Sequence, residues 1–233
     1  MKFRVDGKIF EKFPGLNIGV LVVKGIGNRG VSEEVLELIR RREKEIREEF
    51  STETLSQNPK IDAWRKAYSS FGAKPKKYKC SVENLYRMIL GGIDLKHINK
   101  LVDIYNYISI KHMVPVGGDN TDMVDGDIVL KFAEGNEVFT ELNSQENKNP
   151  KPGEVVYADN KEVLCRRWNW RECEKSKMTE GTKNVALVVE GLPPITNKEI
   201  EGIVKELGEL VKKFCSGKIR EFVLNKDNPE IEI

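Results

Sequence analysis

The sequence predicts an α+β fold in which compact mixed sheets are flanked by helices. Three observations support this class: a buried apolar strand followed by a long amphipathic helix near each end of the chain, further helical stretches in the first half, and short strands with polar turns between residues 127 and 173. Hydrophobic residues make up 39% of the 233, which is enough for a sizeable core. No low-complexity linker divides the chain. We therefore expect a single domain over residues 1–233.

The elements of the first half follow from apolar periodicity and capping residues. A β-rich run that ends at glycines predicts a buried strand, and Ser32 is an N-cap for the helix after it. Three further stretches repeat apolar residues at helical spacing and end near glycine or proline. The sequence thus predicts a strand over 16–26 and helices over 32–50, 61–72, 82–90 and 98–113.

The second half reads mainly as strands. Alternating apolar residues predict short strands over 128–133, 137–142, 154–158 and 162–170. A buried strand over 184–191, a helix that Thr196 caps and that runs to about residue 215, and a strand over 219–224 complete the chain. We expect the strand–helix pairs at the two ends to pack side by side in one sheet.

Composition limits the possible functions. The net charge of +2 argues against a protein that coats nucleic acid through bulk charge, but it permits a local basic patch. No apolar signal region or membrane-spanning stretch is present. The four cysteines include no Cys-x-x-Cys pair, so we expect reduced thiols, a cytoplasmic location, no metal site and no cofactor.

Several segments together resemble one known family. The run INKLVDIYNYI at 98–108 is accompanied by an arginine-bearing helix end, by two strand segments and by the run EGTKNV. These accompanying segments are 87–93, 126–129, 139–142 and 180–185. In this order and spacing they resemble the editing module, or B-three/B-four tRNA-binding domain, of the bacterial phenylalanyl-tRNA synthetase beta subunit. The resemblance covers roughly residues 80–191.

This resemblance implies a module that hydrolyses the ester between a wrong amino acid and its tRNA, a reaction in which a second pocket destroys a product that binding did not exclude. The expected partner is the aminoacylated 3′ end of a tRNA, and neither DNA nor a membrane. No synthetase catalytic core follows, so we expect a freestanding deacylase that does not itself aminoacylate. The alternative is a non-catalytic module that binds tRNA, an amino acid or a nucleotide. The oligomeric state stays open.

The sequence also departs from the family pattern. Gly117 stands where the family has a histidine, and the bulky, cationic run 166–171 stands where the family has small residues. The family's glutamate falls near Val188, and Glu190 shares the face of that strand. These differences indicate a rebuilt pocket, so the tyrosine specificity of the family is not carried over.

Candidate residues for the reaction lie in the resembling segment. An aminoacyl ester is already activated, so the site mainly needs groups that orient water and stabilise an oxyanion. We predict that Asn106 and Glu190 orient water and that Tyr105 substitutes for a family threonine. Gly117 and Gly118 are predicted to form a turn whose backbone contacts the substrate. The alternatives are a buried structural asparagine and an ordinary glycine turn.

The run from Cys165 to Arg171 is the strongest local feature. As a strand it would place Arg167, Asn169 and Arg171 on one face, and Trp168 and Trp170 on the other. Forked arginine donors suit carboxylate, phosphate or ribose groups, and tryptophans stack on bases. We predict that all five bind substrate; the alternative is a tryptophan core with a solvated arginine face.

A basic loop follows the second predicted helix. Lys74, Lys76, Lys77 and Lys79 surround Tyr78. Such a loop is predicted to hold tRNA phosphates, with binding that weakens as salt rises. The alternative is a solvated surface loop.

Overall fold

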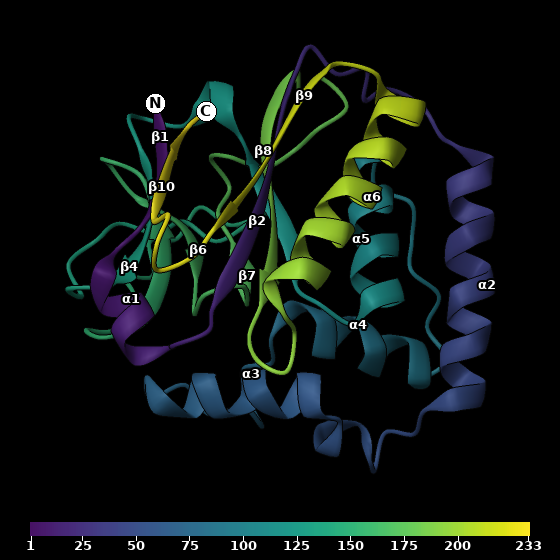
Figure 1. Cartoon of the computed structure of the whole chain (residues 1–233), viewed down its shortest axis with the longest axis horizontal. Helices are drawn as coiled ribbons and strands as arrows, with labels where there is room; N and C mark the ends of the chain where they lie inside the picture. Colours follow the sequence, from purple (N-terminus) through teal and green to yellow (C-terminus); the bar gives the residue numbers. More distant parts are fainter.

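Two β-sheets and a layer of helices make up the computed structural model, which describes residues 1–233 (Figure 1). The six-stranded sheet has the order β10-β1-β4-β5-β6-β7, and the four-stranded sheet has the order β3-β8-β2-β9. Helices flank the four-stranded sheet on the side away from the larger sheet, and α3 runs beneath both (Figure 1). The predicted α+β class with flanking helices is confirmed.

The four-stranded sheet is antiparallel and joins the two ends of the chain. Its strands are β3 (Val116–Asn120), β8 (Asn184–Gly191), β2 (Asn17–Lys24) and β9 (Lys218–Leu224). β2 is buried along almost its whole length because it is central and covered on both faces. The expected side-by-side packing of the two ends is confirmed.

The capped helices form where the polar start signals predict them. In α2 (Glu33–Glu49), the Ser32 side chain accepts from the N–H of Val35. In α6 (Asn197–Cys215), Thr196 and Glu199 form a reciprocal capping box. α6 packs closely on β2, since a Cβ at Gly19 would lie 2.0 Å from Cγ2 of Val204. A glycine is therefore required at this crossing.

The remaining helices position the site. Asn99 caps α5 (Lys100–His112) by accepting from the N–H of Val102. α5 lies between α2, α6 and β3, so the predicted hallmark segment is at the centre of the fold. The other helical segments are α1 (Gly7–Lys12), η1 (Leu55–Gln57), α3 (Pro59–Ser70), α4 (Ser81–Leu90) and η2 (Thr121–Met123).

The six-stranded sheet contains elements that the sequence analysis did not predict. Its strands are β1 (Lys2–Val5), β4 (Ile128–Phe132), β5 (Val155–Ala158), β6 (Val163–Arg166), β7 (Arg171–Glu172) and β10 (Glu230–Glu232). β1 pairs with β4 and β10, which are far away in the sequence. β1, β10 and α1 are too short to show a periodic signal of their own.

Three local predictions were wrong. Residues 137–142 form isolated bridges rather than a strand. The strand over 162–170 stops at Arg166, because Arg167 and Trp168 adopt left-handed φ values of 46° and 68° and turn the chain into β7. Gly117 and Gly118 belong to β3 and are not a turn.

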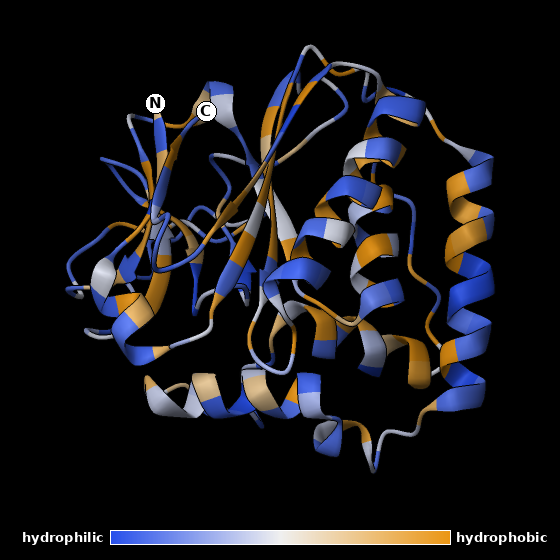
Figure 2. Cartoon of the chain, in the orientation of Figure 1, coloured by the Kyte–Doolittle hydropathy of each residue, from blue (hydrophilic) through white to orange (hydrophobic).

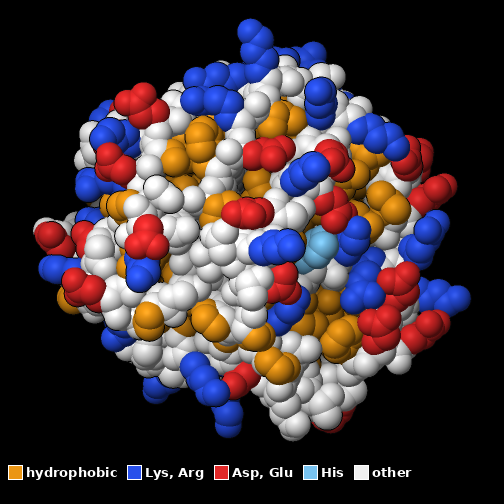
Figure 3. All heavy atoms as spheres, in the orientation of Figure 1, with side chains coloured by type: hydrophobic (Ala, Val, Ile, Leu, Met, Phe, Trp, Pro, Cys, Tyr) orange, Lys and Arg blue, Asp and Glu red, His pale blue; other side chains and the backbone are white.

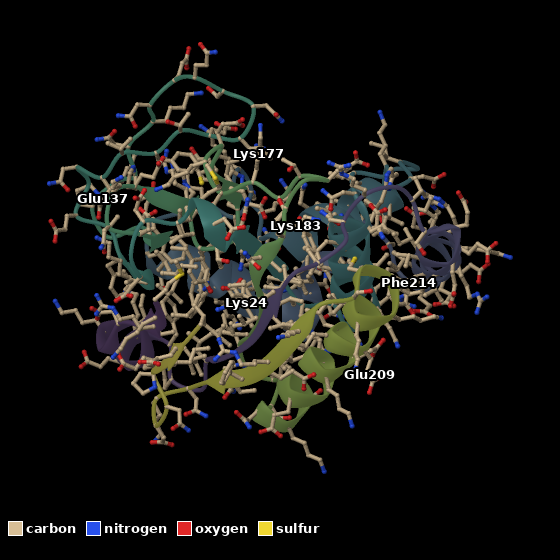
Figure 4. The ribbon with its side chains drawn as sticks, turned by 90° about the horizontal axis from the view of Figure 1, so that it is seen from above. Lys24, Glu137, Lys177, Lys183, Glu209 and Phe214 are labelled. Atoms are coloured by element: carbon tan, nitrogen blue, oxygen red, sulfur yellow. The ribbon has the colours of Figure 1, made fainter.

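A continuous core of buried apolar side chains links both sheets and the helices. The central strands are mainly hydrophobic, whereas the outer face of α2 is hydrophilic (Figure 2). On the surface, acidic and basic groups are interspersed over the face seen in Figure 3. Seen from above, Glu137 and Lys177 lie on the side of the larger sheet, and Glu209 and Phe214 lie on α6 at the opposite side (Figure 4). No helix is long and apolar enough to span a bilayer.

Candidate functional site

A cavity of about 210 Å³, here called the inner cavity, lies between the two sheets. One wall comes from the larger sheet, the opposite wall comes from β3 and β8, and the turn between β6 and β7 closes a third side. The residues that matter most for its chemistry are Ser81, Gly117, Asp119, Tyr157, Trp168, Asn169, Glu172 and Glu190. Segments that are distant in the sequence thus build one pocket.

A second cavity of about 360 Å³, the outer cavity, adjoins the first. Its own lining includes Lys77, Lys79, Tyr105 and Asn106. Five residues line both cavities and define the junction between them: Ser81, Val116, Trp170, Arg171 and Glu172. The structure therefore brings the predicted lysine loop, the hallmark helix and the arginine–tryptophan segment to one place.

Glu190 is held by three donors in the wall of the inner cavity. Its Oε1 accepts from the Tyr157 hydroxyl at 2.5 Å and from Nε1 of Trp168 at 2.6 Å, and its Oε2 accepts from Nδ2 of Asn169 at 2.6 Å. Asn169 Oδ1 in turn accepts from the Tyr68 hydroxyl at 2.8 Å. Tyr157 belongs to β5, whereas Trp168 and Asn169 are consecutive in the turn after β6, so Glu190 in β8 is bonded both to the larger sheet and to this turn.

Three carboxyl groups of the inner cavity share a perturbed acidity. Burial raises the pKa of Glu190 to about 7, although its three donors oppose the shift. Burial and the nearby charge of Asp119 raise the pKa of Glu172 to about 7. Burial likewise raises the pKa of Asp119 to about 6, although Ser176 donates to it. All three carboxyl groups are thus harder to ionise than aspartate and glutamate in water.

The arginine–tryptophan segment does not present the predicted row of side chains. Arg166 and Arg167 are both buried against Glu154, with nitrogen–oxygen distances of 2.9 and 3.1 Å. Arg171 instead lies at the junction, with its Nε 3.1 Å from Glu141 Oε1. The prediction that Arg167, Asn169 and Arg171 share one face of a strand was therefore wrong, because the left-handed turn interrupts the alternation of side chains.

The two tryptophans have different environments. Trp168 is fully buried and packs on Phe13 and Trp64, with ring centroids 4.8 and 4.9 Å away. Trp170 is half-buried at the junction, with the guanidinium carbons of Arg167 and Arg171 4.6 and 4.8 Å from its ring. Trp168 therefore combines core packing with the Glu190 contact, whereas Trp170 shapes the passage between the cavities.

Two polar side chains of the hallmark helix face the outer cavity without a protein partner. The side chains of Asn106 and Tyr105 line this cavity and make no hydrogen bond to another protein group. Burial raises the pKa of Tyr105 well above its ordinary value, so its hydroxyl stays protonated. Both groups are available to a ligand, in contrast to Asn169 and Glu190.

The lysine loop divides into two pairs. Lys77 and Lys79 line the outer cavity, whereas Lys74 and Lys76 are exposed and lie outside it. The Lys79 ammonium donates to the carbonyl of Lys76 at 3.0 Å, which fixes the loop. The positive charge near the cavity thus comes from Lys77, Lys79 and Arg171.

The glycine pair contributes space rather than a turn. A Cβ at Gly118 would lie 2.3 Å from the carbonyl oxygen of Ala186, so only glycine allows β3 to approach β8 there. A Cβ at Gly117 would lie 3.4 Å from Oε1 of Glu172 and would project into the cavity. Gly117 therefore leaves room beside the Glu172 carboxyl.

Sequence reasoning missed Ser81, Asp119 and Glu172. Asp119 lies in an acidic run that is typical of turns, and Glu172 and Ser81 belong to no recognisable motif. Oγ of Ser81 is buried and has no hydrogen-bond partner, although the residue lines both cavities. The one feature that marks Ser81 in the sequence is its position just before a predicted helix. A serine there is normally explained by helix capping and does not indicate a ligand site.

Comparisons with known proteins identify the family. No curated protein matches the sequence. Among solved structures, the chain is similar to an N-terminal fragment of the phenylalanyl-tRNA synthetase beta subunit from Pyrococcus horikoshii, with a TM-score of 0.49 and 14% identity over 95% of this chain and 53% of that chain. This chain thus spans about half the length of that fragment. The B3/4 domain matches residues 63–209, more than half of the sequence, and the chain therefore belongs to the B3/4 domain family.

Proposed function

We propose that this B3/4 domain protein binds the aminoacylated 3′ end of a tRNA and hydrolyses the ester of a mischarged amino acid. The observation that carries the proposal is the pair of joined cavities. The inner cavity has a volume suited to one amino acid, while the adjoining outer cavity is larger and is lined by lysines. An amino acid in the former and the terminal ribose and phosphates in the latter would place the ester at the junction.

The charges of the outer cavity support a polyanionic partner. Lys77 and Lys79 lie at its rim, and Arg171 lies between it and the inner cavity. Lysine ammonium groups bind phosphates electrostatically without reading sequence, and such contacts release counterions from the nucleic acid. They would hold the backbone of the acceptor end while the cavities receive its terminus.

The uncommitted polar groups at the junction and in the outer cavity beside it support ester hydrolysis. A water oriented by Asn106 attacks the ester carbonyl carbon; the carbon–oxygen bond to the ribose breaks and the proton passes to the ribose oxygen. The Ser81 hydroxyl, which has no protein partner, would donate a hydrogen bond to the oxyanion that forms. Glu190 accepts hydrogen bonds from the side-chain N–H groups of Trp168 and Asn169 and thereby positions these two residues.

A deacylation assay with a panel of mischarged tRNAs tests this proposal. Asn106→Ala should slow hydrolysis by roughly tenfold or more, because its amide orients the water, while leaving thermal stability nearly unchanged. Asn136→Ala is the matched control, since Asn136 is exposed and lies in neither cavity. A wild-type rate no higher than that of buffer hydrolysis for every tRNA in the panel would contradict the proposal.

A non-catalytic binding module is the second candidate. One observation favours it: the Glu190 carboxyl is already occupied by three donors and offers little to a water molecule. This reading predicts that tRNA or an amino acid raises the melting temperature while no tRNA is deacylated.

A further inference from the structure

We propose that the inner cavity binds a primary ammonium group of its ligand, with Glu172 and Asp119 as the acceptors. This inference rests on the proposed function, because it specifies which part of an aminoacyl ester enters the cavity. It applies equally to the α-ammonium of any amino acid and to the side-chain ammonium of a basic one.

Glu172 has the features of an unoccupied acceptor. It lines both cavities, and its carboxyl makes no hydrogen bond and no ion pair with any protein group. Oε1 is close to β3 at Gly117, where the missing side chain leaves space beside the carboxyl. A ligand group can therefore reach this oxygen from the cavity.

Asp119 adds a second acceptor from β3, on the opposite wall of the cavity from Glu172 in β7. Its Oδ1 accepts from the Ser176 hydroxyl, while Oδ2 has no partner. Arg171 is the one cationic side chain that lines the inner cavity, and its guanidinium is paired with Glu141 and stacked on Trp170. The nearby charge of Lys175 favours the ionised form of Asp119, but its ammonium is paired with Asp125 and Asp159. Neither Glu172 nor Asp119 therefore forms an ion pair within the protein.

The cost of burying these carboxyls points to a cation. An ionised carboxylate in a poorly hydrated cavity is unfavourable unless a positive group or several donors accompany it. The pKa values of Glu172 and Asp119 are raised, as expected for carboxyl groups without a positive partner or several donors. A ligand ammonium would supply three N–H donors and one positive charge to the same cavity.

A second, independent observation also points to a ligand here. The buried Oγ of Ser81 has no hydrogen-bond partner at the junction. A buried hydroxyl without a partner is uncommon in a folded protein and is normally satisfied by a bound group. An ammonium group near Glu172 would bring the ester of the same ligand towards Ser81.

Calorimetric titration with three stable amides separates the possible sources of the ammonium. Alaninamide carries only the α-ammonium, Nα-acetyl-lysine amide carries only the side-chain ammonium, and Nα-acetyl-norleucine amide carries neither. Binding of the first or the second, at least roughly tenfold tighter than that of the third, supports the inference and identifies the source. Equal binding of all three, or binding of none, would overturn it.

Two variants and a control complete the test. Glu172→Gln removes the charge and should weaken ammonium binding by roughly tenfold or more. Gly117→Ala keeps the charge but fills the space beside it, so it should weaken binding as well. Glu146→Gln, at an exposed site that pairs only with Lys148, should bind like the wild type. Unchanged affinity in both cavity variants would overturn the inference.

The outcomes for the two proposals are distinguishable. If mischarged tRNAs are hydrolysed but the amides bind without regard to charge, the ammonium site is wrong and the deacylase function stands. If the charged amides bind selectively but no tRNA is hydrolysed, the ammonium site stands and the deacylase function is wrong.

Discussion

The two cavities share a wall but differ in how their polar groups are used. In the inner cavity, the side chains of Glu190, Asn169 and Trp168 are committed to one another. In the outer cavity, Asn106 and Tyr105 have no protein partner. The difference teaches that proximity to a pocket does not make a residue available to a ligand. Substitutions in the inner network should therefore cost stability, and those in the outer cavity should cost function.

The largest expected effect is a loss of stability when Trp168 of the inner network is replaced. Trp170 at the junction is the residue for comparison. Trp168→Ala should lower the free energy of unfolding by about 3–5 kcal/mol, because it removes a fully buried ring and one donor to Glu190. Trp170→Ala, at the half-buried junction, should cost clearly less. Chemical denaturation of both variants measures the difference, and equal losses would remove the distinction between the two regions.

An intermediate effect per residue is expected from pH. The folded protein holds protons on Glu172 and Glu190 with a pKa of about 7, above the value of an unfolded glutamate. The stabilisation from each is thus fully present below about pH 4.5 and is lost as the pH rises through about 7, by roughly 3 kcal/mol at most. Denaturation between about pH 5 and about pH 8 should show the decline.

Glu172→Gln sharpens this measurement because it removes one titrating group without changing the shape of the side chain. The decline in unfolding free energy should become shallower in the variant. A decline as steep as that of the wild type would show that the charge of Glu172 is not held in a poorly hydrated environment.

The smallest effect is expected at the lysines of the outer cavity. Replacing Lys77 and Lys79 with alanine should weaken tRNA binding by roughly three- to tenfold and make the salt dependence shallower by about 1–2 in log–log slope. The matched control replaces Lys74 and Lys76, which lie in the same loop but outside the cavity. Identical behaviour of the two double variants would indicate a diffuse basic surface instead of a defined contact.

The sequence predicted most of the fold where the signal is local. α2 and α6 begin at the expected caps because Ser32 and Thr196 bond to the following turn. The order of strands at both ends was also foreseeable from their apolar runs. β1 and β10 were not, since their pairing depends on partners distant in the chain.

The candidate site was less predictable because its geometry is set by long-range contacts. The turn at Arg167 and Trp168 is held by Glu154 and Glu190, which lie elsewhere in the sequence. Asp119 resembles an ordinary turn residue until β3 and the larger sheet enclose it. The motif around Asn106 pointed to the helix that lines the outer cavity, but not to which neighbouring side chains are already hydrogen-bonded.

The three hydrogen bonds to Glu190 have a consequence for ligand selectivity. Because Tyr157 belongs to one sheet and Glu190 to the other, the hydrogen bond between them holds the two sheets at a fixed separation. A ligand too large for the inner cavity could enter only by breaking this hydrogen bond and exposing the buried carboxyl of Glu190. If the inner cavity binds the amino acid as proposed, this fixed separation would limit the size of the side chain that fits.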